Sequence, residues 1–279
     1  MTPLPHQPYR ALTIAASDSS GAAGVQADLK TFEARGVYGL CALTAITAQD
    51  SQTIYALHAL DPLLISRQVR AVLADIGADA VKTGLLLYAP VIESIREALN
   101  ASGYGGPLVV DPVLIAGDGR PLADDAAIAA YRQHLFPLAA VITPNLGEAS
   151  ILLGSPLKTV EDMCAAAKSL KDSTKAAAVL IKGGHLEGEF MADVLYDGVN
   201  VQVYPVKRLP LINPRGTGCT YSACLTAELA QGQTLSSALE KTIRYLAVAL
   251  ESAAMWSLGA GRGTIHHSVG RPPLFSNIP

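Results

Sequence analysis

A short glycine-containing turn in the last third of the chain combines residue types that can bind an anion and move a proton. Residues 216–220 read Gly-Thr-Gly-Cys-Thr, with Pro214 and Arg215 before them and an apolar-periodic stretch after them. This pattern predicts a sharp turn that leads into the N-terminus of a buried helix. The free backbone N–H groups and the positive dipole at such a helix end can bind a phosphate.

Cys219 would lie at this helix end, where the positive dipole lowers the pKa of a thiol and favours an accessible thiolate. The sequence therefore predicts a reactive cysteine beside an anion site. An isolated Gly-x-Gly is also found at many ordinary helix starts, where a cysteine is only a small buried side chain. The turn alone leaves both interpretations open.

Other polar residues follow apolar runs that are typical of strands. They are Asp18, Gln49, Lys82, Asp111, Asn145 with Glu148, and Lys182. Ligands of open α/β sheets bind beyond the carboxyl ends of the strands, so we expect these side chains to gather at one edge. Each alone could be an ordinary strand-end residue that faces water. Together, two carboxylates suited to Mg²⁺ and a lysine near an anion-binding helix end favour phosphoryl transfer.

The elements that would hold these residues alternate along the chain. Apolar runs predict strands at 11–16, 40–47, 53–60, 79–84, 108–112, 139–145 and 177–184, and a hairpin over 194–203. Helical patterns are predicted over 25–35, 62–74, 89–102, 219–231 and 235–258. Alternating strands and helices favour right-handed βαβ units and a mostly parallel sheet with helices on both faces. We expect one three-layer α/β domain.

Composition excludes several classes of function. The chain has 279 residues, of which 50% are hydrophobic and 16% charged, so it can bury the core of one large domain. A net charge of -3 gives no electrostatic footprint for nucleic acid or an anionic membrane. No apolar run has the length of a membrane helix, and the first ten residues do not resemble a signal peptide. The four cysteines lack zinc spacing, so we expect reduced thiols in the cytoplasm.

As a set, the motifs resemble the hydroxymethylpyrimidine/phosphomethylpyrimidine kinases of thiamine biosynthesis, in the ribokinase-like superfamily. The motifs are Ala11–Ala15, Ser17–Gly21, Gly24–Phe32, Thr47–Gln49, Val81–Gly84, Val110–Val113, Thr143–Glu148, Lys182–His185 and Gly216–Thr220. The resemblance implies a three-layer ribokinase-like fold, with a mostly parallel central sheet flanked by helices, in a homodimer. The kinase domain would span residues 11–268, between an N-terminal extension (1–10) and a C-terminal tail (269–279).

The resemblance also implies an activity and roles for particular residues. The activity is MgATP-dependent phosphorylation of 4-amino-5-hydroxymethyl-2-methylpyrimidine, followed by phosphorylation of its monophosphate. Gly216, Thr217 and Gly218 would form the anion hole, and Cys219 would be the base for the substrate hydroxyl. Gln49 would hydrogen-bond the aminopyrimidine in a pocket lined by Ala23, Leu85 and Val113. Asp111 and Glu148 would lie near Mg²⁺, and Asn145, Lys182 and Arg215 on the nucleotide side.

Two positions depart from the family pattern. Relatives usually have lysine where this chain has Gly117, and histidine where it has Arg215, so one cation is lost near the phosphates and another is gained. The alternatives are a pyridoxal kinase and a non-catalytic protein that binds thiamine precursors. Gln49 argues against the first, because pyridoxal-preferring relatives have methionine there. The full set of phosphoryl-transfer residues argues against the second, because a sensor needs none of them.

Overall fold

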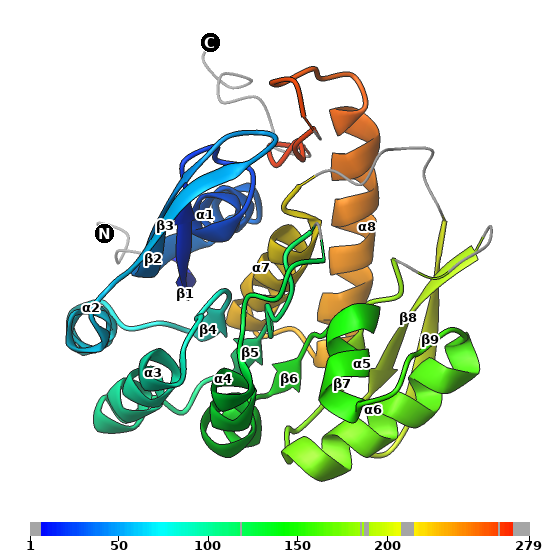
Figure 1. Cartoon of the computed structure of the whole chain (residues 1–279), viewed down its shortest axis with the longest axis horizontal. Helices are drawn as coiled ribbons and strands as arrows, with labels where there is room; N and C mark the ends of the chain where they lie inside the picture. Colours follow the sequence, from blue (N-terminus) through cyan, green and yellow to red (C-terminus); the bar gives the residue numbers. More distant parts are fainter. Residues whose placement is uncertain are drawn as a thin grey trace, which may run out of the picture.

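A nine-stranded sheet runs through the described residues (Figure 1). The computed structural model describes residues 7–117, 119–184, 186, 190–207, 215–261 and 263–269. In pairing order the strands are β3 (Ile54–Ala59), β2 (Tyr38–Gln49), β1 (Arg10–Asp18), β4 (Ala80–Thr83), β5 (Leu108–Val110), β6 (Val141–Ile142), β7 (Val179–Ile181), β8 (Phe190–Tyr196) and β9 (Val201–Lys207). The strands from β2 to β7 pair in parallel, and β3, β8 and β9 are antiparallel.

Helices cover both faces of the sheet, which confirms the three-layer α/β fold (Figure 1). One face packs against α2 (Pro62–Asp75), α3 (Ala89–Ala101), α4 (Asp125–Ala130), α5 (Leu146–Leu153) and α6 (Val160–Thr174). The other face packs against α1 (Gly24–Ala34), α7 (Thr217–Ala230) and α8 (Leu235–Ala253). The central strands are buried on both sides, which is why β5, β6 and β7 are apolar runs without alternation. In β4 the buried positions include the polar residues Lys82 and Thr83.

The sequence patterns predicted no helix range for α4, α5 or α6, and the other elements differ from the prediction mainly at their ends. The predicted helix over 235–258 stops at Ala253, and Met255 beyond it is 89% exposed. The strand predicted over 139–145 is reduced to Val141–Ile142. A helical segment that the prediction lacked begins at α4, where the Asp124 side chain accepts a hydrogen bond from the Ala127 backbone. It continues through a π-helical turn and a 3₁₀ turn to Leu138.

No helix in the part of the chain that the structure describes is both long and apolar enough to cross a membrane. The predictions for residues 1–6, His185, Pro214 and 270–279 fall outside the described residues.

Candidate active site

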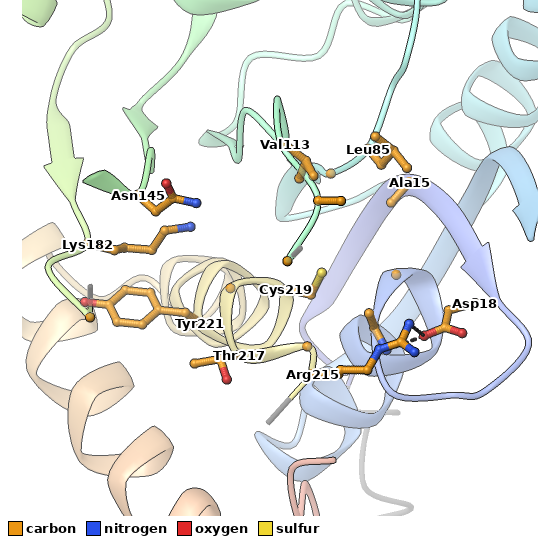
Figure 2. A pocket seen from close by; sticks show the side chains of 18 of the residues that line it. Ala15, Asp18, Leu85, Val113, Asn145, Lys182, Arg215, Thr217, Cys219 and Tyr221 are labelled. Atoms are coloured by element: carbon orange, nitrogen blue, oxygen red, sulfur yellow. Dashed lines mark hydrogen bonds and ion pairs between the residues drawn. The ribbon is translucent and has the colours of Figure 1, made fainter. Parts of the chain in front are cut away.

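A pocket of about 470 Å³ opens beyond the carboxyl ends of the parallel strands, where the start of α7 faces the end of β1 (Figure 2). The structure brings most of the predicted site residues together there. Those that line the pocket are Asp18, Ala23, Gln49, Lys82, Leu85, Val113, Asn145, Lys182, Arg215, Gly216, Thr217, Gly218 and Cys219. Asp111 and Glu148 do not line it, and both are buried, with 2% and 3% of their surface exposed.

The turn before α7 is built for close approach of a ligand to the backbone. Gly216 has φ +83°, and a Cβ there would lie 1.8 Å from the carbonyl oxygen of Ala22, so only glycine fits. A Cβ at Gly218 would lie 3.6 Å from Nζ of Lys182, which places this cation beside the helix start. The arrangement joins free N–H groups, a helix dipole and a lysine, as an anion site requires.

A C-terminal strap, residues 263–269, holds this turn from outside. The backbone N–H of Arg215 donates to the carbonyl oxygen of Gly263 over 2.9 Å. One turn into α7, Oγ1 of Thr220 lies 3.0 Å from Nε2 of His267. Ile265 is buried in the same core cluster as the start of α7. The strap therefore fixes the backbone that forms the anion site.

Cys219 lies in the first turn of α7, but its thiol is not the activated group that the sequence predicted. Burial raises the pKa of Cys219 to about 11. The charge of Lys82 and a backbone hydrogen bond from Gly24 lower this pKa, whereas the charges of Asp28 and Asp111 raise it. The prediction of a lowered pKa is therefore wrong, because loss of water around the thiol outweighs the positive groups near it.

Lys182 and Asp111 form the centre of a buried polar network. Nζ of Lys182 donates to Oδ1 of Asp111 over 2.8 Å, and the hydroxyl of Thr143 donates to the same oxygen over 3.0 Å. The hydroxyl of Ser222, on α7, donates to Oδ2 over 3.1 Å. Asp111 thus fixes the lysine against the first turns of α7, with the ammonium at the pocket wall.

Glu148 belongs to the N-terminal cap of α5. Asn145 accepts a hydrogen bond from the Glu148 backbone over 2.9 Å, and Oε2 of Glu148 accepts one from the Asn145 backbone over 2.8 Å. Burial raises the pKa of Glu148 to about 8, and the nearby charge of Asp111 adds to this effect while Lys182 opposes it. The capping box therefore holds Asn145 at the pocket and keeps a second carboxyl group close to Asp111.

One end of the pocket is apolar, and the sequence analysis did not identify it. Side chains from the β8–β9 hairpin and from one face of α8 line it: Met191, Val206, Ile243, Leu246, Ala247 and Leu250. Beside them, the Tyr221 hydroxyl donates to Oδ2 of Asp193 over 2.6 Å. An apolar slot of this kind fits an aromatic ring system. In the sequence, the α8 residues of this slot have the spacing of an ordinary core-facing helix, so they did not indicate a binding site.

Comparison with known proteins decides the family. The phosphomethylpyrimidine kinase family model matches residues 18–266. The chain belongs to the phosphomethylpyrimidine kinase family. It is therefore a phosphotransferase of the ribokinase-like fold, and a kinase of this family uses ATP.

Individual relatives of this kinase are similar over nearly the whole chain. A hydroxymethylpyrimidine/phosphomethylpyrimidine kinase of Rhizobium meliloti is 42% identical over 257 residues, which cover 92% of this chain and 96% of the relative. The solved ADP complex of Bacillus subtilis pyridoxal kinase is 39% identical, with a TM-score of 0.84, and the match covers 94% and 98% of the two chains. A phosphomethylpyrimidine kinase from Clostridium difficile is 38% identical, with a TM-score of 0.76, over 86% and 98%.

Arg215, one of the two departures from the family pattern, links three segments of this kinase. Its guanidinium donates to the carbonyl oxygen of Asp50, in the turn between β2 and β3, and lies 3.8 Å from Oδ2 of Asp18, at the end of β1 (Figure 2). The same turn is held by Ser19, whose hydroxyl donates to the carbonyl oxygen of Gln49 over 2.7 Å. Arg215 therefore lies between the anion-binding turn and the strand end that carries Gln49.

Proposed function

We propose that this kinase phosphorylates 4-amino-5-hydroxymethyl-2-methylpyrimidine and then its monophosphate, in thiamine biosynthesis, at the expense of ATP. The observation that carries the proposal is that Gln49, Cys219 and the Gly216–Gly218 turn line one pocket. A substrate whose ring reaches Gln49 can thus place its hydroxymethyl group beside a base and an anion site. The names of the relatives support the same substrate.

The pocket suggests how the two substrates are placed. The apolar end between the β8–β9 hairpin and α8 fits the adenine ring, and the Gly216–Gly218 turn with Lys182 fits the phosphates. We propose that the Cys219 thiolate accepts the hydroxyl proton as the hydroxyl oxygen bonds to the γ-phosphorus and ADP leaves. The N–H groups of the turn and the Lys182 ammonium then stabilise the charge on the transferring group.

The residues present also fit Mg²⁺. No cluster of three or more His, Cys, Asp and Glu side chains that could hold a metal occurs among the described residues. Mg²⁺ does not need one, because it usually binds through one or two carboxylates together with substrate phosphates and water. Asp111 and Glu148 are near enough for the charge of one to raise the pKa of the other, an arrangement that a divalent cation would relieve. Bound there, Mg²⁺ would neutralise phosphate charge.

Gln49→Met tests the choice of pyrimidine. One carboxamide can accept from an exocyclic amine and donate to the ring nitrogen beside it, and methionine can do neither. We expect the variant to lose hydroxymethylpyrimidine turnover and to shift its preference toward pyridoxal, because unpaired polar atoms are costly. Competition assays with both substrates measure the ratio, and Gln52→Met, in the exposed turn nearby, is the matched control. An unchanged ratio would remove Gln49 from the specificity role.

Arg215→Ala tests the second phosphorylation. Adding phosphate to a phosphate brings two anions together, so an extra cation near the anion hole favours this step more than the first. We expect the variant to slow formation of the diphosphate much more than formation of the monophosphate, and Arg215→Lys to retain part of the difference. A mass-spectrometric time course of both products measures this, with Arg120→Ala, three residues after Gly117, as the comparison. Equal slowing of both steps would mean that Arg215 acts only through its contacts with Asp18 and Asp50, as a structural residue.

Phosphorylation of pyridoxal is the second candidate, because solved relatives with TM-scores of 0.84 and 0.85 are named pyridoxal kinases. A coupled ADP-release assay over hydroxymethylpyrimidine, its monophosphate and pyridoxal separates the two activities. Absence of ADP release with all three would instead favour a binding protein. We also propose that residues 11–268 act as one catalytic unit in the cytoplasm. We further propose that the protein assembles as a homodimer, and light scattering on the purified protein tests this assembly.

A further inference from the structure

An ion pair lies completely out of contact with solvent beneath the anion-binding turn. Nζ of Lys82 lies 2.8 Å from Oδ1 of Asp28, and both side chains have 0% of their surface exposed. Asp28 is held in turn by Thr13, whose hydroxyl donates to Oδ2 over 2.6 Å. Well-packed apolar side chains often stabilise a protein as much as a buried ion pair does. The sequence analysis expected Lys82 at a strand end. Because stability alone does not explain a buried lysine there, Lys82 is a candidate for a functional role.

The pair lies where three elements meet. Lys82 is in β4 and Asp28 is in α1. Helix α7, which has Cys219 in its first turn, packs against both elements (Figure 1). Lys82 and Cys219 line the same pocket. Within the described residues, Asp28 is the only side chain that accepts a hydrogen bond from Lys82. An ammonium has three N–H groups, so Lys82 keeps donors for a partner on the pocket side.

Four charged side chains from different elements act on the Cys219 thiol. Lys82 in β4 lowers the pKa of the thiol, while Asp28 in α1 and Asp111 after β5 raise it. Lys182, after β7, also interacts with the thiol, since an ionised Cys219 raises the pKa of that lysine. Burial is the largest single influence on Lys82 and lowers its pKa, but the negative charges of Asp28, Cys219 and Asp111 together raise this pKa above its usual value, so Lys82 stays cationic.

We propose that Lys82 is a positioning residue of the kinase reaction, which stabilises the Cys219 thiolate while Asp28 holds the ammonium in place. The proposal rests on the role of Cys219 as base. In that step an S–H bond forms as the substrate O–H bond breaks, and the hydroxyl oxygen bonds to the γ-phosphorus as the bond to ADP breaks. Lys82 transfers no proton. Its charge offsets the desolvation that disfavours the thiolate.

The test measures the reactivity of the thiol without any substrate. Iodoacetamide reacts with thiolate, and peptide mass spectrometry resolves the alkylation rate at Cys219 from the rates at the other cysteines. An opposite charge nearby shifts a pKa by roughly 1–3 units, so Lys82→Met should slow alkylation at pH 8 by about tenfold or more. We expect kcat to fall in parallel and KM for ATP to change little. Lys168→Met, the same change at an exposed position of α6, should alter neither quantity.

A second variant covers the case in which Lys82→Met fails to fold because Asp28 is left unpaired in the interior. The double variant Lys82→Met with Asp28→Leu removes both charges and replaces them with apolar side chains of similar volume. Lys82 acts on the thiol more strongly than Asp28 does, so alkylation of Cys219 should still be slower than in the parent protein.

Each outcome decides the proposal. An unchanged alkylation rate at Cys219 in the folded single or double variant overturns it and leaves Lys82 a structural residue. Slower alkylation with a parallel fall in kcat supports it. Because alkylation needs no substrate, slower alkylation in a protein whose parent phosphorylates no pyrimidine would reject the proposed function and still support the coupling of Lys82 to Cys219.

Discussion

Cys219→Ala should lower kcat by at least about 10²-fold and leave the affinity for ATP nearly unchanged. A positioned base contributes roughly 10²- to 10⁴-fold to a rate, and the backbone N–H groups of the turn remain when the side chain is removed. Cys164→Ala, on α6 and outside the pocket, is the control. A kcat within a few-fold of the parent value would show that only the backbone of the turn acts.

The pH dependence of kcat/KM tests the same role of Cys219. Burial raises the pKa of Cys219 to about 11, so the thiolate fraction is small at neutral pH and rises about tenfold with each pH unit. The value of kcat/KM, which reports the free enzyme, should therefore rise between pH 7 and pH 9 in the parent protein. In Cys219→Ala this rise should disappear. A parent profile that is flat over this range contradicts a thiolate base.

Gly216→Ala should lower kcat/KM by about 10²- to 10³-fold, which is the effect of losing one donor to a transferring anion. The substitution places a Cβ 1.8 Å from the carbonyl oxygen of Ala22, at φ +83°, so the turn must move. Strain at such a position costs about 1–3 kcal/mol, so the Tm should also fall. Steady-state kinetics and thermal unfolding of the same preparation measure both effects.

Gly232 provides a matched control for this substitution. It has φ +77°, and a Cβ there meets nothing within 4 Å. Gly232→Ala therefore adds similar backbone strain without a clash and away from the pocket, and its kcat/KM should stay within a few-fold of the parent value. If the two alanine variants lose activity equally, the loss reflects general destabilisation, and the Gly216 turn does not hold the transferring group.

Much of the sheet could be predicted from the sequence because strands buried on both faces leave a clear trace. The predicted strands at 11–16 and 108–112 contain the apolar runs Ile14–Ala16 and Leu108–Val110, and each coincides with a strand of the sheet. Element ends were less predictable, as at α8, because exposed apolar residues such as Met255 continue the helical pattern past the last turn. In such places the sequence pattern reflects composition, whereas the end of the helix is determined by local backbone geometry.

The candidate site was predictable where a residue type implies chemistry. Lys182 and the Gly216–Gly218 turn carry such signals, and the structure places them at the pocket. Burial cannot be read from a residue type. The sequence therefore could not show that desolvation raises the pKa of Cys219, or that Lys82 and Asp28 form a buried ion pair. The apolar slot was missed for the same reason, since Leu246 has the same appearance in a core as in a binding pocket.

The late position of α7, α8 and the C-terminal strap has a consequence for synthesis on the ribosome. All the strands of the described sheet are translated by Lys207, whereas the helices that cover Val109, Val141 and Leu180 come later. Roughly 60 residues follow up to the end of the strap, so at about 5–20 residues per second this face stays uncovered for roughly 3–12 seconds. A nascent chain in this interval presents an apolar sheet surface to chaperones and to neighbouring chains, and it has no anion site until the strap emerges.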